Sequence, residues 1–95
     1  MVVAILRLRL IIHGSRSLKG KRQVVKAVTA RVRNRFNVSV AEVGDHDLWQ
    51  SAVIGVAAVG VDRAVVNSLA DRIVDFVETA GGAELADHRM EIVNC

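Results

Sequence analysis

One short segment near the start of the chain combines residue types that bind anions. Residues 15–22 read Ser-Arg-Ser-Leu-Lys-Gly-Lys-Arg, so cationic side chains surround the start of a predicted helix. The first N–H groups of a helix have no intrahelical acceptor, and the helix dipole places about half a positive charge there, which favours phosphate. Cations oppose that dipole, so a turn built only for stability would contain acids. We therefore interpret the segment as an anion-binding site; the alternative is a solvated turn with Lys21 lying along the edge of the core.

The cationic character continues along the helix that this segment begins. Ser17 is a good N-cap, and the apolar spacing predicts a helix that runs to about Phe36. Four of its cations fall within a stripe about 60° wide and about 21 Å long, enough to follow several phosphates of a nucleic-acid backbone. We call Lys19, Arg22, Lys26 and Arg33 the basic stripe. The predicted anion- or RNA-binding residues are Arg16, Ser17, Lys19, Lys21, Arg22, Lys26 and Arg33.

The basic helix has a second interpretation, in which its charges pair with a neighbouring helix. Residues 62–79 form another predicted helix, which carries Asp71, Asp75 and Glu78 opposite its apolar face. If the two helices lie side by side, Arg31 or Arg35 would meet Asp71 or Asp75. The basic stripe and the opposite flank of its helix cannot both face the acidic helix. Because isolated surface ion pairs contribute little to stability, they would not require so many cations.

The charges of the chain are divided between its two parts. Residues 1–41 hold ten of the 13 Lys and Arg residues and no acid, whereas residues 42–95 hold all ten Asp and Glu residues. This asymmetry indicates an anion-binding surface or two surfaces that neutralise each other. No apolar stretch reaches the roughly 18 residues of a membrane span, and residues 1–12 contain Arg7 and Arg9, unlike a signal peptide. The single Cys95 cannot form an internal disulfide, so we expect a cytoplasmic protein.

The elements that must position these residues follow from hydrophobic periodicity and turn signals. The alternation predicts strands over residues 1–12, 37–43, 48–61 and 83–93, with helices over 17–36 and 62–79. The order βαββαβ predicts an α+β, ferredoxin-like fold: a four-stranded antiparallel sheet with strands one and three central and two helices on one face. We expect one domain over residues 1–95. The third strand is nearly apolar on both faces, so we expect both to be buried.

The sheet face that points away from the helices carries Arg7 and Arg9 and no aromatic ladder. That composition argues against a sheet that stacks RNA bases. An apolar sheet face with a few arginines is more typical of a protein interface, so we predict a homodimer. Trp49 is predicted to be a packing anchor; the alternative is a base-stacking platform.

No cofactor or metal site is predicted. His13, His46 and His88 stand in different elements, and Cys95 is isolated. A remote enzymatic alternative is an acylphosphatase-like site, because acylphosphatases share this topology. In such a site Arg16 would bind phosphate and Asn37 would orient water. The regulatory ACT module also has this element order, but it usually stands beside a catalytic domain. We expect a protein that is not an enzyme.

Three motifs carry a resemblance that covers nearly the whole chain. They are Ser17-Leu18-Lys19 with Lys21-Arg22, the run from Phe36 to Glu42, and Leu48-Trp49-Gln50 followed by Ile54-Gly55-Val56. Together they resemble the YlxP-like family of small bacterial proteins of unknown function. The resemblance implies a ferredoxin-like fold and, because the family is often encoded near translation-initiation and ribosome-maturation factors, association with RNA or the ribosome. It implies no catalytic residue.

One position departs from the pattern of that family. The family usually has an acid where this chain has Gly20, and the acid would complete a capping box with Ser17. Glycine removes that reciprocal bond and lowers helix propensity by about 1 kcal/mol relative to alanine. We therefore expect a first turn that is less rigid and more purely positive.

Overall fold

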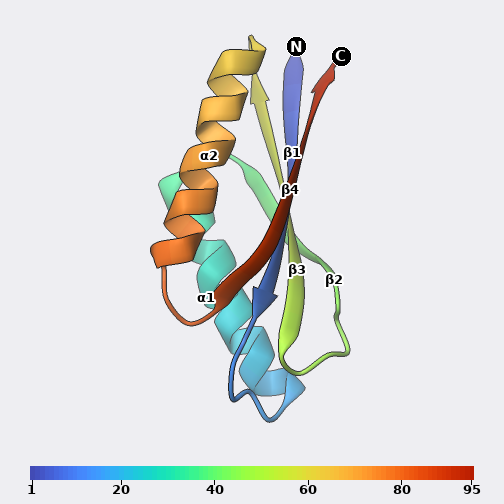
Figure 1. Ribbon diagram of the computed structural model, residues 1–95, viewed down its shortest axis with the longest axis vertical. Helices are drawn as coiled ribbons and strands as arrows, with labels where there is room; N and C mark the ends of the chain where they lie inside the picture. The colour runs from blue at the N-terminus through green and yellow to red at the C-terminus, as the bar shows by residue number, and fades with distance from the viewer.

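The computed structural model describes all 95 residues and has the predicted order of elements. The strands and helices follow one another in the order βαββαβ (Figure 1). Their bounds are β1 Val2–Ile11, α1 Leu18–Arg35, β2 Ser39–Gly44, β3 Ser51–Gly60, α2 Arg63–Thr79 and β4 Glu84–Asn94. The predicted N-cap Ser17 is confirmed, and Asp62 caps α2.

The sheet has the strand order β2-β3-β1-β4, and every neighbouring pair is antiparallel. The ferredoxin-like fold is thereby confirmed, with β1 and β3 in the centre. A register shift between Arg9 and Leu10 interrupts the pairing of β1 with β4, which lies at the edge of the sheet. The chain ends extend this pairing, since the Cys95 amide donates to the Met1 carbonyl at 2.8 Å.

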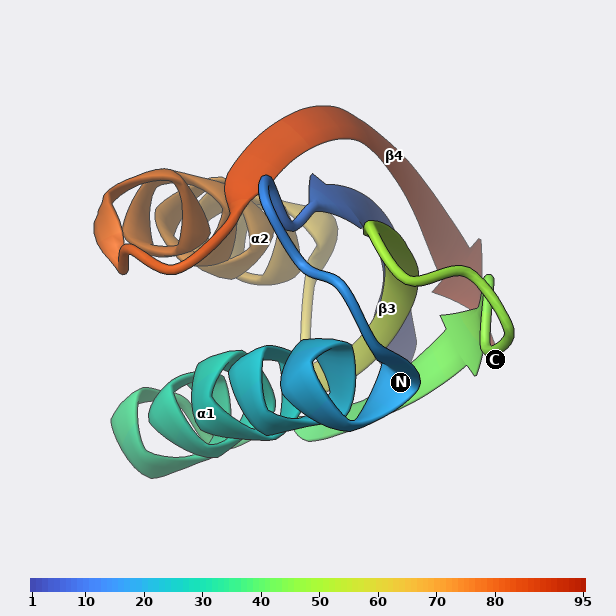
Figure 2. The same cartoon turned by 90° about the horizontal axis from the view of Figure 1, so that it is seen from below.

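Both helices cover the same face of the sheet (Figure 2). Alternate residues of β1 point into that layer, and Leu6, Leu8 and Leu10 are buried there against both helices and β3. The C-terminal ends of the two helices meet through Phe36 and Phe76, whose rings form an edge-to-face pair with centroids 5.6 Å apart. No helix is both long and apolar enough to cross a membrane.

The opposite face of the sheet is uncovered. The outer residues of β3 include Val59, which is 64% exposed, while their neighbours on the inner face, such as Val56 and Ala58, are buried. The prediction that β3 is buried on both faces is therefore wrong within one chain. Both helices lie on the inner face of the sheet, so nothing in the chain covers the outer face of β3. The apolar residues at these outer positions are small or β-branched, and such side chains are common on the surface of a strand.

Candidate anion-binding surface

The start of α1 has the N-cap geometry that the sequence predicts. Ser17 has an extended backbone, and its hydroxyl oxygen accepts a hydrogen bond from the Gly20 amide at 3.0 Å. The Ser15 hydroxyl donates to the Ser17 carbonyl at 3.2 Å. No acid stands in the first turn. Half of a capping box is therefore present without the acidic partner, and the Ser17 side chain serves the helix rather than an external anion.

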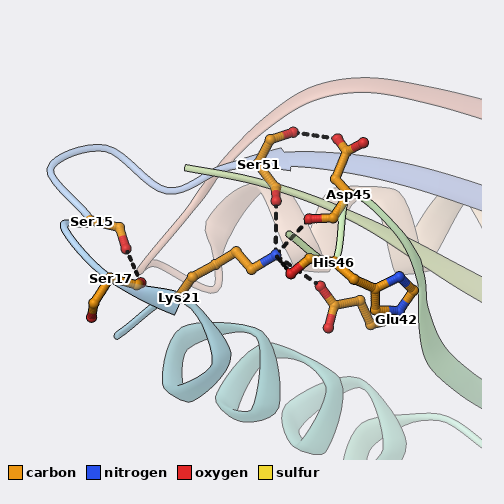
Figure 3. Close-up of polar contacts among 7 residues, drawn as sticks. All are labelled: Ser15, Ser17, Lys21, Glu42, Asp45, His46 and Ser51. Carbon is orange, nitrogen blue, oxygen red and sulfur yellow. Dashed lines mark hydrogen bonds and ion pairs between the residues drawn. The ribbon is translucent and has the colours of Figure 1, made fainter. Parts of the chain in front are cut away.

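Lys21 differs most from its predicted role. Its side chain is 0% exposed, and its ammonium group is surrounded by protein acceptors (Figure 3). Nζ donates to the carbonyl oxygens of Asp45, His46 and Ser51 at 2.7, 3.2 and 3.2 Å, and it lies 3.2 Å from Glu42 Oε2. The prediction that Lys21 binds an external anion is wrong, because its three protons are occupied inside the molecule.

Lys21 instead joins α1 to the connection between β2 and β3. Asp45 turns this connection with a positive φ of 59°, and Ser51 Oγ donates to Asp45 Oδ2 at 2.6 Å. Gln50 Nε2 donates to the Ser15 carbonyl at 3.2 Å, which ties the same connection to the loop after β1. The sequence did not predict these partners of Lys21, because none of them is adjacent to Lys21 in the chain. The available signal was the position of Lys21 four residues before Val25 and seven before Val28, on the apolar face.

The basic stripe lies on the flank of α1 that faces β2. Arg33 Nη2 donates to the Val40 carbonyl at 3.1 Å, which fixes that side of the helix. The other flank faces α2, because Arg31 Nη1 donates to the Ala80 carbonyl at 2.8 Å and Arg35 lies 5.7 Å from the centre of the Phe76 ring. The two helices therefore meet through backbone and aromatic contacts rather than through the acids of α2.

The cations of the basic stripe and Arg16 are exposed and have no carboxylate partner. The ion pair of the structure is Lys21–Glu42, and the His13 imidazole is hydrogen-bonded to Glu84. Lys19, Arg22, Lys26 and Arg33 are all exposed on one flank, with Arg16 in the loop before the helix. The alternative in which α1 forms ion pairs with Asp71 or Asp75 is therefore wrong. Five of the seven predicted residues are therefore exposed cations without a carboxylate partner, and four of them share one flank of α1.

The acylphosphatase-like pair is not brought together. Arg16 precedes α1 and Asn37 follows it, and an 18-residue helix is about 27 Å long. One phosphate cannot contact both side chains across that distance. This pairing is therefore wrong. No three His, Cys, Asp or Glu side chains form a group that would hold a metal ion.

Trp49 lies in the connection between β2 and β3 rather than in the core. Its side chain is 54% exposed, and the neighbouring Leu48 is also exposed. Trp49, Leu48 and Ile11 line a shallow hollow of about 390 Å³ together with Gln50 and Ser51. The prediction that Trp49 is a packing anchor is wrong, because Lys21 holds the ends of this connection while the indole stays outside.

Comparison with known proteins places the chain among relatives of unknown function. Residues 3–90 match the family described as "Protein of unknown function (DUF503)". The chain belongs to this family. It is similar to the uncharacterized protein YlxP of Bacillus subtilis (strain 168), with 41% identity over 69 residues, which are 73% of this chain and 75% of that protein. The resemblance to the YlxP-like family is therefore confirmed.

A solved structure supports the fold alone. The de novo designed protein Foldit4 has a TM-score of 0.53 and 14% identity, and the match covers 99% of this chain and 97% of the design. At that identity the likeness concerns the arrangement of helices and strands.

Proposed function

We propose that this protein binds RNA along the β2-facing flank of α1, as a binding protein rather than an enzyme. The observation that carries the proposal is that the exposed cations of the basic stripe have no carboxylate partner. Four like charges on one flank repel each other in the free protein, so an anion that lies along the helix relieves this repulsion. The carboxylate of Glu42, on neighbouring β2, is already paired with Lys21 and does not neutralise the stripe.

The dimensions of the surface favour a polyanion over a single small anion. Lys19 and Arg33 are 14 residues apart on a regular helix, so they are separated by about 21 Å. Several phosphates of one chain fit along that length, each with a cation beside it. Ribosomal RNA is the target that agrees with the resemblance described above, and it would place the protein in the cytoplasm.

Charge reversal tests this assignment. In K19E/R22E, two cations of the basic stripe become acids, and we expect RNA affinity to fall by about tenfold or more because phosphate contacts dominate such binding. The slope of log affinity against log salt should shrink by about 0.7 to 0.9 for each phosphate that the variant no longer neutralises. Fluorescence anisotropy with labelled ribosomal RNA fragments measures both quantities.

The matched control is R63E/R72E on α2. Both arginines are exposed and lack an ion pair, so this variant changes net charge by the same amount on a different surface. It should retain most of the affinity. Equal losses in the two variants would mean that net charge alone attracts RNA, and unchanged binding in K19E/R22E would remove RNA from this flank.

The uncovered outer face of the sheet favours a second candidate function, in a different class. We propose that this face binds a second copy of the chain. It carries exposed apolar side chains, such as Ile5 and Val43, and it also carries both signs of charge. Asp87 lies opposite Arg9 in the register, yet it forms no ion pair within its own chain. Both signs are therefore available to a partner of the same composition, and the two proposals use opposite sides of the molecule.

A further inference from the structure

The exposed indole of Trp49 lies at the end of the molecule where the proposed RNA surface begins. The loop after β1, the first turn of α1 and the β2–β3 connection all gather at the lower end in Figure 1, and Figure 2 shows the same three segments nearest the viewer. Gln50, the residue after Trp49, donates to the carbonyl of Ser15, which directly precedes Arg16. The indole is therefore carried by a residue adjacent to the cationic loop.

The backbone that carries Trp49 is held firmly although its side chain is not buried. The Ile12 amide donates to the Gln50 carbonyl at 2.9 Å, and the Leu48 amide donates to the Asp45 carbonyl at 3.1 Å. Lys21 binds the carbonyls on both sides, at His46 and Ser51. A tryptophan on an anchored loop loses little conformational freedom when a ligand covers it, which is the property of a preorganised contact.

The surroundings of the indole suit a flat ligand that is attached to phosphates. The hollow beside it, about 390 Å³, is lined by Ile11, Leu48 and Trp49, with the polar Gln50 and Ser51 at its edge. The hollow is open to solvent, and no carboxylate lines it. A base in the hollow would have an aromatic face to stack on, and the loop that carries Arg16 is hydrogen-bonded to Gln50 beside it.

We propose that Trp49 stacks an unpaired base of the RNA that binds α1, so that the ligand is a single strand or a loop rather than a duplex. This inference rests on the proposed function and adds the class of RNA to it. Bases in a duplex are stacked on each other and expose only their edges, whereas an unpaired base presents its π-face to an aromatic side chain. The basic stripe would bind either form, and Trp49 would distinguish between them.

The composition of the chain gives a direct measurement. Trp49 is the single tryptophan and there is no tyrosine, so emission excited at the indole band reports this position alone. We expect a short labelled oligouridylate to raise anisotropy and quench Trp49 emission over the same concentration range. The same strand annealed to oligoadenylate should raise anisotropy without quenching.

Two variants separate stacking from mere apolar contact. W49L keeps an apolar side chain without a π-face, and because the residue is exposed it should fold as the wild type does. Its affinity for oligouridylate should be roughly 5- to 150-fold weaker, the range measured for loss of one stacked base, with duplex affinity unchanged. W49F retains a ring and should recover much of the loss.

The outcomes distinguish this inference from the proposed function. If oligouridylate binds without quenching and W49L binds as tightly as the wild type, the stacking role is wrong while RNA binding at α1 stands. If neither the single strand nor the duplex changes anisotropy, RNA binding and the stacking role fail together. If K19E/R22E weakens binding of both forms and W49L weakens binding of the single strand only, both proposals are supported.

Discussion

Lys21 shows how one buried charge can organise a surface without taking part in it. Its ammonium group replaces its hydration shell with the carboxylate of Glu42 and the carbonyls of Asp45, His46 and Ser51. Taking an ammonium group out of water is expensive unless such partners surround it. The carbonyls of Asp45 and His46 belong to the connection that carries Trp49, and Ser51 is the first residue of β3, so the shape of that loop depends on a residue of α1.

We expect Lys21→Met to destabilise the fold. Methionine preserves much of the length of the side chain but leaves Glu42 without its partner and removes the ammonium donor from three carbonyls, which costs about 3 kcal/mol in the free energy of unfolding. Urea denaturation followed by circular dichroism measures this loss. The exposed Lys19→Met is the control and should change stability by less than about 0.5 kcal/mol. Equal stability of the two variants would contradict the anchoring role.

At the scale of elements, β3 and α2 approach each other closely at Gly60. A Cβ placed on Gly60 would lie 2.6 Å from Cγ1 of Val66, which is fully buried in the first turns of α2. The side chain of Asp62 accepts a hydrogen bond from the Val65 amide at 2.9 Å and starts the helix directly after the strand. The absence of a side chain at Gly60 therefore permits the tight return of the chain onto the sheet.

Gly60→Ala should cost about 1–3 kcal/mol of unfolding free energy, because the new methyl group has no room unless α2 shifts. Gly55→Ala on the same strand is a close control. Its Cβ would lie 3.0 Å from Cγ1 of Val43, but Val43 is exposed on the edge strand and can move. Thermal unfolding of both variants tests the difference. If both lose the same stability, the close approach of α2 is not the cause.

At the scale of the whole molecule, the helices and the sheet present two different surfaces. The helix layer carries the basic stripe, while the outer sheet face carries exposed apolar residues with charges of both signs. Arg7 lies directly opposite Arg89 in the β1–β4 register. Like charges at directly opposed positions destabilise a sheet, so a counter-charge from a second copy would compensate them.

Sedimentation equilibrium at micromolar concentration tests the homodimer. We expect a species of twice the chain mass of 10.3 kDa, and Ile5→Glu in the centre of the outer face should weaken association by about tenfold or more. Val65→Glu, at an exposed apolar position on α2, is the control and should leave association unchanged. A strict monomer for the wild type would exclude this interface.

The elements could be predicted because their signals are local. Alternation along β1, the 3.6-residue period of both helices and the caps Ser17 and Asp62 all act within a few residues of chain. The order of the sheet then followed from the right-handed crossovers that connect such elements. The cations of the basic stripe were also found from the sequence, since their alignment depends only on helical geometry.

The sequence alone therefore determined the elements, their order and the alignment of the cations. Only the tertiary structure decided which of these cations are free, because that depends on which flank of α1 turns toward α2 and which toward β2. The same long-range packing buried Lys21, left Trp49 outside, kept Arg16 and Asn37 at opposite ends of a helix, and left one face of β3 uncovered. Contacts between residues distant in the chain set these outcomes, and periodicity, which acts over a few residues, does not encode them.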